Sequence, residues 1–198
     1  MNCDREIFTR AMELWTEWND RINVISRKDI DRIYEHHILH SLAIAEYLER
    51  RGESLDGMEV LDVGCGGGFP GIPLAMVNPE ARFTLCDSIG KKVKVAQSVS
   101  EGCGLTNVHC VNARAESLGQ DFDWVVSRAV TSLDNFYPWV KGRYRKGILY
   151  LKGGDVNEEI SVMCARHHVD PSKVSVWPVS AWLDDEYFAE KFVIEIGK

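Results

Sequence analysis

Four glycines, Gly64, Gly66, Gly67 and Gly68, stand close together in the segment VLDVGCGGGFPGIPLA (60–75). Residues without a β-carbon let the backbone turn sharply and approach a ligand closely. The apolar residues before the glycines suit a short parallel strand, and the prolines after them suit the first turn of a helix, where no N–H is needed. A strand, a glycine turn and a helix N-terminus in this order predict a nucleotide-binding corner.

The spacing of these glycines indicates which nucleotide. A dinucleotide loop has the spacing G-x-G-x-x-G; Gly64 and Gly66 fit it, but Phe69 occupies the last position and the third glycine comes one place early, at Gly68. No lysine follows Gly71, which argues against a phosphate-binding P-loop. The spacing G-x-G-x-G looks like the S-adenosylmethionine loop of Rossmann-like methyltransferases. A nicotinamide-dependent dehydrogenase, a non-catalytic nucleotide-binding module and a glycine turn without a ligand are the alternatives.

A carboxylate ends the next apolar run, Arg82–Asp87. Asp87 follows Gly64 by 23 positions, close to the spacing of about 20 residues at which an acidic side chain meets ribose hydroxyls. The competing interpretation is that Asp87 caps a helix that begins near Gly90. We favour ribose binding.

Strand and helix patterns alternate after residue 58, which predicts a mostly parallel seven-stranded sheet with helices on both faces. We expect the last two strands to pair as an antiparallel edge hairpin, and residues 56–198 to form one Rossmann-like methyltransferase domain. After 60–63 and 82–87, the expected strands are 108–111, 124–127, 148–152, 174–179 and 192–196. The expected helices between them are 91–101, 133–140 and 157–167.

Residues 1–55 carry a different pattern, which predicts an N-terminal helical cap packed on the main domain. Apolar residues at three- and four-residue steps indicate one helix from Ile7 to Ile22 and a second that follows a capping box of Ser26 and Asp29. Gly52 is expected to end the second helix. The turn between the two helices is polar, so we interpret this cap as a wall of the substrate cleft rather than as mere edge packing.

Composition fits a single-domain enzyme without metal. The chain has 198 residues, 45% of them hydrophobic, and no run approaches the roughly 18 apolar residues of a membrane span. Without a signal-peptide pattern, a cytoplasmic and monomeric protein without a membrane partner is expected.

The cysteines form no C-x-x-C pair, so we expect buried, reduced thiols. They are Cys3, Cys65, Cys86, Cys103, Cys110 and Cys164.

Seven motifs together resemble the small-subunit ribosomal RNA methyltransferase G family, also known as glucose-inhibited division protein B. The similarity runs from about residue 14 to residue 154, and the motifs occur in the order of the family. They are WNDRINVISRKD (18–29), HHILHSLA (36–43), LDVGCGGGFPGIPLA (61–75), DSIGKK (87–92), GLTNVHCVNARAE (104–116), VVSRAV (125–130) and LKGG (151–154). The resemblance implies methylation of N7 of one guanine in 16S ribosomal RNA, with S-adenosylmethionine as cofactor. The chain departs from the family pattern at His36 and His40, which replace an arginine and an aspartate.

The resemblance implies cofactor-binding roles for Gly64, Gly66, Gly68, Phe69, Asp87, Ser88, Ala115, Glu116 and Arg128. Asp87 and Ser88 would lie at the ribose, Ala115 and Glu116 beside the adenine, and the Arg128 guanidinium at the methionine carboxylate. The expected partner is small-subunit ribosomal RNA or a ribosomal particle. The expected RNA-binding residues are Arg27, Lys28, His37, Lys91, Lys92, Arg114 and Lys152.

Methyl transfer to guanine N7 needs no general base, because N7 carries a lone pair and no proton. We therefore expect positioning rather than a catalytic dyad, with Arg114, Arg128 and Lys152 as candidates and no metal site. A net charge of −7 is unusual for an RNA-binding protein, so we expect the basic groups 27–32, 91–94 and 141–152 to share one rim of the cleft. A methyltransferase of the same fold acting on a small molecule or a protein is the alternative function.

Overall fold

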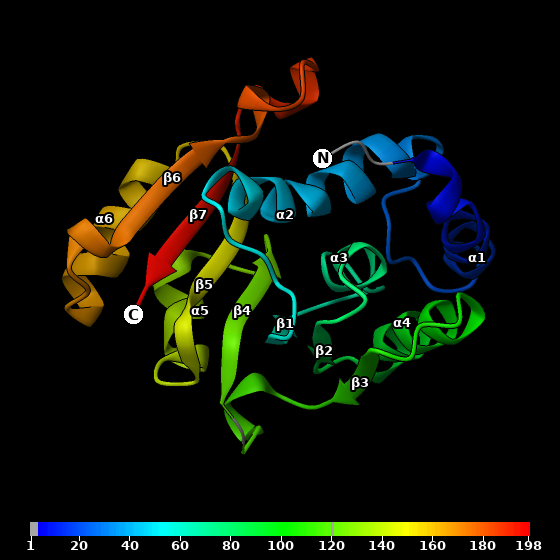
Figure 1. Cartoon of the computed structure of the whole chain (residues 1–198), viewed down its shortest axis with the longest axis horizontal. Helices are drawn as coiled ribbons and strands as arrows, with labels where there is room; N and C mark the ends of the chain where they lie inside the picture. Colours follow the sequence, from blue (N-terminus) through cyan, green and yellow to red (C-terminus); the bar gives the residue numbers. More distant parts are fainter. Residues whose placement is uncertain (1–3, 120) are drawn as a thin grey trace.

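A single seven-stranded sheet organises the computed structural model, which describes residues 4–119 and 121–198 (Figure 1). The strand order is β3-β2-β1-β4-β5-β7-β6, and β7 runs antiparallel to both of its neighbours while the other pairs are parallel. The predicted α/β class and the antiparallel pairing of the last two strands are confirmed. The strands are β1 (Glu59–Val63), β2 (Arg82–Asp87), β3 (Val108–Asn112), β4 (Phe122–Arg128), β5 (Tyr144–Gly153), β6 (Val174–Pro178) and β7 (Lys191–Gly197).

Helices cover both faces of the sheet, as the alternating pattern predicts. The α-helices are α1 (Thr9–Asn19), α2 (His40–Arg50), α3 (Gly71–Val77), α4 (Gly90–Gly102), α5 (Leu133–Val140) and α6 (Val156–His167). The short helical turns are η1 (Arg5–Phe8), η2 (Ile30–Arg32), η3 (Tyr34–Leu39, a π-helix), η4 (Ala115–Ser117), η5 (Pro171–Lys173), η6 (Val179–Ala181) and η7 (Glu186–Phe188).

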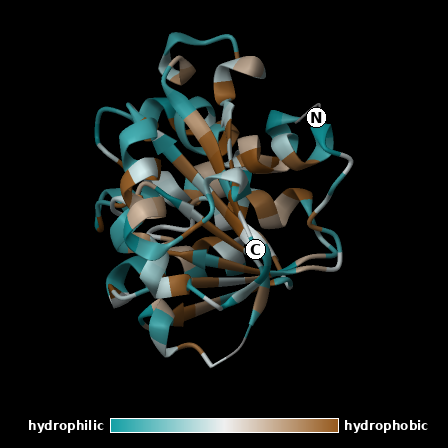
Figure 2. Cartoon of the chain, turned by 90° about the vertical axis from the view of Figure 1, so that its left-hand side faces the viewer, coloured by the Kyte–Doolittle hydropathy of each residue, from teal (hydrophilic) through white to brown (hydrophobic). Residues whose placement is uncertain are grey.

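Two hydrophobic clusters, one on each face, hold these layers together. Val60 belongs to the cluster that packs against α1 to α4, and the next residue, Leu61, belongs to the cluster that packs against α5 and α6. This alternation is the two-residue period of a strand that is buried on both faces. Figure 2 shows the same layering as hydrophobic strands inside a more hydrophilic outer surface. Five described cysteines are free thiols, three of them buried; Cys3 lies outside the described residues.

The N-terminal segment differs in detail from its prediction. The first helix ends at Asn19 rather than Ile22, because the Asn19 side chain turns the chain by accepting hydrogen bonds from the Val24 and Ile25 N–H groups, each at 2.9 Å. The predicted capping box at Ser26 and Asp29 is wrong. The Asp29 carboxylate contacts His36 Nδ1 at 3.1 Å, so it does not cap the helix. The second helix accordingly starts with the irregular turns η2 and η3 before α2.

The α2 helix ends as predicted. Gly52 has a φ of +70°, and its N–H donates to the Glu49 carbonyl while the Glu53 N–H donates to the Leu48 carbonyl. This pattern is the left-handed cap for which glycine is favoured. Contacts of α1 with α4, and of α2 with α3 and β5, place the N-terminal helices on one face of the sheet.

The strand order reverses at the centre of the sheet. The connections lead from β1 to β2 and β3 on one side, and from β4 to β5 on the other, so the loops after β1 and β4 diverge there. In open α/β sheets ligands bind in the crevice at such a switch point, outside the carboxyl ends of the strands. The candidate site lies at these strand ends.

Candidate functional site

A cavity of about 400 Å³ opens where the loops after β1, β2, β3 and β4 meet. Its size is typical of a site for a small molecule or cofactor. The lining residues come from all four strand ends and the loops after them, from the start of α4 and from α5: Val63, Gly64, Cys86, Asp87, Ser88, Ile89, Lys92, Ala113, Arg114, Ala115, Glu116, Arg128, Ala129, Val130 and Trp139.

The glycine turn forms one wall of this cavity. Gly64, Gly66 and Gly68 have φ values of +69°, +55° and +110°, which residues with a β-carbon rarely adopt. A β-carbon on Gly64 would lie 2.5 Å from the Val130 side chain, and one on Gly68 would lie 2.3 Å from Ile72. The glycines are therefore required by backbone conformation and close packing, with Gly64 lining the cavity and Gly66 and Gly68 shaping the turn.

The Asp87 carboxylate ties the turns after β1 and β2 together. Its oxygens accept hydrogen bonds from the Gly66 N–H at 3.0 Å and the Ile89 N–H at 2.8 Å. Helix α4 begins at Gly90 with Ile89 as its N-cap residue, and no side chain caps it, so the interpretation of Asp87 as a helix cap is wrong. Asp87 is 9% exposed and lines the cavity, so its carboxylate orders the turn and also borders the cavity.

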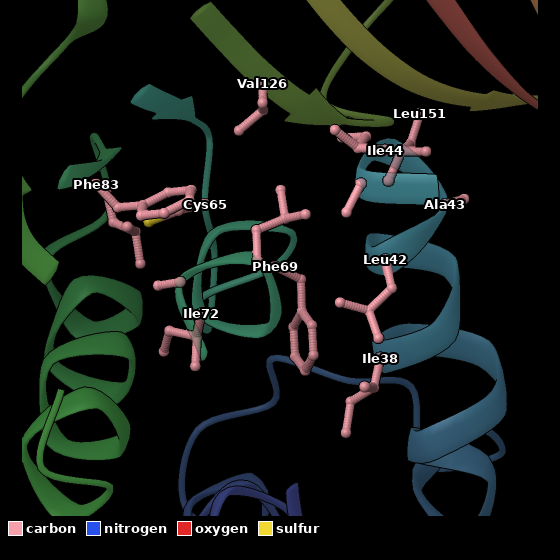
Figure 3. Close-up of a cluster of buried hydrophobic side chains, with 14 of the residues drawn as sticks. Ile38, Leu42, Ala43, Ile44, Cys65, Phe69, Ile72, Phe83, Val126 and Leu151 are labelled. Atoms are coloured by element: carbon pink, nitrogen blue, oxygen red, sulfur yellow. The ribbon is translucent and has the colours of Figure 1, made fainter. Parts of the chain in front are cut away.

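Phe69 turns away from the cavity into the N-terminal helices. Figure 3 shows its ring pointing towards Ile38 and Leu42, and the ring stacks on Trp15 at 4.2 Å between centroids. Trp15 Nε1 donates to the Gly67 carbonyl at 2.7 Å, so the first helix holds the glycine turn directly. The helical segment therefore fixes the turn from behind, an arrangement that glycine spacing alone does not reveal.

Arg128 lies between the cavity and these helices. Its guanidinium lies 4.8 Å from the centre of the Phe69 ring, and it forms no ion pair with the residues that the structure describes. Its Nη2 atom donates to His37 Nδ1 at 3.0 Å. Burial, together with the Arg128 charge, lowers the pKa of His37 to about 3, so the imidazole is neutral. His37, expected to bind RNA, is partly buried and its Nδ1 accepts a hydrogen bond from Arg128.

A second buried carboxylate supports the turn. Asp62 Oδ2 accepts from the Gly71 N–H at 2.8 Å, at the start of α3, while Oδ1 is buried and unpartnered. Burial raises the pKa of Asp62 to about 7 despite this hydrogen bond. Asp62 therefore stabilises the junction of turn and helix without facing the cavity.

The loop between β4 and α5 forms the opposite wall. Ala129 has a φ of +46°, and the loop around it is held by Tyr150, whose hydroxyl contacts Val130 and Thr131. Lys152 Nζ donates to the Thr131 carbonyl at 3.1 Å and pairs with Glu159 at 3.0 Å. Lys152 was expected to contact RNA, and its ammonium is engaged within the protein.

The predicted basic rim is only partly assembled. Lys92 and Arg114 line the cavity, and Lys91 is exposed beside them at the start of α4. The expectation that 141–152 joins this rim is wrong for residues 141–146. Because β5 runs parallel to β4, its first residues lie at the end of the sheet opposite the cavity. Lys141 lines a different hollow there.

Seven lining residues are missing from the predicted site: Val63, Cys86, Ile89, Ala113, Ala129, Val130 and Trp139. Ile89 is exposed directly after the Asp87–Ser88 pair, Val130 follows the S-R-A motif, and Trp139 comes from the last turn of α5. An exposed isoleucine or valine beside a motif is a weak signal, and nothing in the sequence connects Trp139 with the strand ends. Together they give the cavity an apolar component suited to a flat ring.

The described residues offer no metal centre and no membrane span. Within 4–119 and 121–198, no group of three or more His, Cys, Asp or Glu side chains is placed to hold a metal ion. Among the same residues, no helix is both long enough and apolar enough to cross a bilayer.

Comparison with known proteins gives consistent matches. The family whose model matches residues 4–181 is described as rRNA small subunit methyltransferase G. The chain is similar to proteins named ribosomal RNA small subunit methyltransferase G from Christiangramia forsetii and Flavobacterium psychrophilum. Identity to the first is 45%, covering 94% of this chain and 87% of the relative. Identity to the second is 46%, covering 96% and 88%.

Solved structures share the fold at low sequence identity. A magnesium protoporphyrin IX methyltransferase from Synechocystis PCC 6803 with bound SAM matches with a TM-score of 0.65 at 16% identity, covering 98% of this chain and 95% of that chain. A 16S rRNA N2 methyltransferase from T. thermophilus, in complex with AdoMet and guanosine, matches with a TM-score of 0.60 at 17% identity, covering 90% and 44%. These similarities establish the Rossmann-like methyltransferase fold.

Proposed function

This chain belongs to the rRNA small subunit methyltransferase G family, an S-adenosylmethionine-dependent family, and we propose that it methylates N7 of a guanine in small-subunit ribosomal RNA. The observation that carries this proposal furthest is the cavity at the strand ends, where the glycine turn, Asp87 and Arg128 come together. Six of the nine residues expected to bind the cofactor line it: Gly64, Asp87, Ser88, Ala115, Glu116 and Arg128.

The chemistry of these residues fits the cofactor. Asp87 offers carboxylate lone pairs to ribose hydroxyls, Ala115 and Glu116 line the wall expected at the adenine, and Trp139 adds an aromatic surface. Arg128 is a part-buried cation without a carboxylate partner among the described residues, which suits the carboxylate of a methionine moiety. We propose that Phe69 and neutral His37 hold this guanidinium in place.

The proposed reaction needs no general base, because guanine N7 carries no proton. Bound S-adenosylmethionine supplies an electrophilic methyl group on a sulfonium. The residues of this chain then have to orient the guanine and exclude alternative geometries, and alignment of this kind accounts for large rate effects. We assign this positioning to Arg114 and Arg128, which line the cavity, and to Lys152, which acts from behind its wall by holding the Thr131 carbonyl.

The RNA-binding surface is proposed to lie beside this mouth. Lys91, Lys92 and Arg114 form no ion pair with the described residues, and the same holds for Arg27 and Lys28 in the turn after α1. Other exposed arginines, such as Arg5, Arg10 and Arg82, pair with glutamates. Unpaired cations beside a cavity are available to phosphate groups, so a protein with net charge −7 can still bind RNA locally.

We further propose that the chain acts as a monomer in the cytoplasm. The large hydrophobic side chains exposed on its described surface are scattered over separate elements, and two of them border the cavity. They are Ile7, Ile89, Val130, Val162 and Val176. A permanent dimer would bury a larger continuous apolar area.

Methyl transfer to RNA tests the proposed function. Small subunits from a strain that lacks this gene are incubated with the purified protein and labelled S-adenosylmethionine, and the RNA is mapped by cleavage at N7-methylguanine. We expect one new cleavage site in the small-subunit RNA. Label that enters a protein or a small molecule instead would favour the alternative methyltransferase, and label in RNA without this cleavage would refute N7 as the target atom.

A further inference from the structure

The loop between β4 and α5 adopts a costly conformation at the cavity. Ala129 has a φ of +46°, in the left-handed region that residues other than glycine rarely adopt. Ala129 and the next residue, Val130, both line the cavity, and Val130 keeps 38% of its surface exposed. Strained backbone of this kind persists only where surrounding contacts impose it.

The Tyr150 hydroxyl supplies these contacts. It donates to the Thr131 carbonyl at 2.8 Å and accepts from the N–H groups of Val130 and Thr131 at 3.0 and 3.2 Å. A phenol has one proton to donate and two lone pairs to accept with, so its hydrogen-bonding capacity is fully used by this loop. The Tyr150 ring is 0% exposed and packs edge-on against Phe136, with 4.8 Å between centroids, so the hydroxyl cannot move away.

Lys152 and Glu159 extend this support to the neighbouring helices. Lys152 Nζ donates to the same Thr131 carbonyl and pairs with Glu159, whose other oxygen accepts from the Leu133 N–H at 3.1 Å. The loop is thereby tied to β5, α5 and α6. Contacts within the protein therefore hold its conformation.

The held loop fixes where Val130 lies. Gly64 has no β-carbon, and one placed there would come within 2.5 Å of Val130 Cγ2, so Val130 packs directly over the glycine turn. A shift of Val130 would change the distance between the turn expected to hold the cofactor and the loop that forms the opposite wall of the cavity. Transfer of a methyl group along one line is sensitive to displacements of this size.

We propose that Tyr150 is a positioning residue for the methyl transfer, acting through Ala129–Thr131 and Val130. The proposal rests on the proposed function for the reaction it assists. Tyr150 touches neither reactant and exchanges no proton with them. Its contribution is the alignment of the target base with the methyl group.

Tyr150→Phe tests this role, because it removes only the hydroxyl. Tyr144→Phe is the matched control, since Tyr144 is a buried tyrosine of the same strand that lies beside Tyr137 at a different hollow, away from the cavity. We expect Tyr150→Phe to lower kcat roughly tenfold with less than about a twofold change in cofactor Kd. We expect Tyr144→Phe to keep the wild-type kcat and to lower Tm by about as much as Tyr150→Phe does.

Amide hydrogen exchange provides a readout that needs no RNA. Exchange at Val130 and Thr131 should accelerate in Tyr150→Phe and stay unchanged in Tyr144→Phe. Unchanged exchange at these amides, or a wild-type kcat in Tyr150→Phe, would overturn the proposal. If wild-type protein does not methylate RNA, the proposed function fails, whereas the exchange measurement still decides whether Tyr150 orders this loop.

Discussion

Removal of the unpaired cations at the cavity mouth should weaken RNA binding in a salt-dependent way. Lys91, Lys92 and Arg114 have no ion-pair partner among the described residues, so phosphate contacts would release counterions without breaking internal salt bridges. Each phosphate contact contributes about 0.7 to 0.9 to the slope of log K against log salt. The triple alanine variant should therefore lower that slope by about 2 to 3, and weaken binding at about 0.1 M salt by roughly 100-fold.

The control removes equal charge from sites that are already paired. Arg5, Arg10 and Arg82 are exposed and bound to Glu35, Glu13 and Glu59, so their triple alanine variant should keep the wild-type slope. Binding of small-subunit RNA is measured by filter retention over a range of salt concentrations. Calorimetry with S-adenosylmethionine separates cofactor effects, and Lys91→Ala alone should leave cofactor affinity nearly unchanged. Equal slopes for the two triple variants would refute the placement of the RNA-binding surface.

Further predictions concern the turn that forms the site. Gly68→Ala should reduce the free energy of unfolding by about 2–4 kcal/mol, because φ is +110° and the new β-carbon would meet buried Ile72 at 2.3 Å. Gly66→Ala, at φ +55° with open space around it, should lose only about 1–2 kcal/mol, and urea unfolding compares the two. Burial raises the pKa of Asp62 to about 7, above its unfolded value, so the folded state binds the extra proton and stability falls as pH rises from about 4 to 7. Asp62→Asn should remove this component of the pH dependence, and Tm measured from pH 4 to 8 would contradict the reasoning if the two curves stayed parallel.

Local patterns in the sequence predict most of the secondary structure. The expected helix at 133–140 coincides with α5, and the strand at 82–87 coincides with β2. Prediction is wrong where a side chain finds a partner beyond its immediate neighbours, as when Asp29 contacts His36, seven residues away, instead of capping a helix. Propensity describes what a residue does next to its neighbours, whereas such contacts depend on the folded chain.

The roles of the charged residues also depend on contacts that the sequence does not reveal. The sequence identifies the lysines and arginines, yet their availability depends on pairing in space. Lys152 is engaged by Glu159 and the Thr131 carbonyl, while Lys92 at the cavity has no ion-pair partner among the residues that the structure describes. Neither outcome can be predicted from spacing along the chain. His37 likewise becomes a neutral partner of Arg128 because the fold buries it.

The sequence by itself determined the nucleotide corner, because few structures other than a ligand-binding turn require so many residues without a β-carbon directly after a strand, here at G-x-G-x-G spacing. It also determined the order of strands and helices, through apolar periodicity. Only the tertiary structure decided which side chains converge on the corner. Trp15, Trp139 and Tyr150 come from three separate elements, and their contacts with the glycine turn, the cavity and the β4–α5 loop arise because the sheet brings distant segments to one edge.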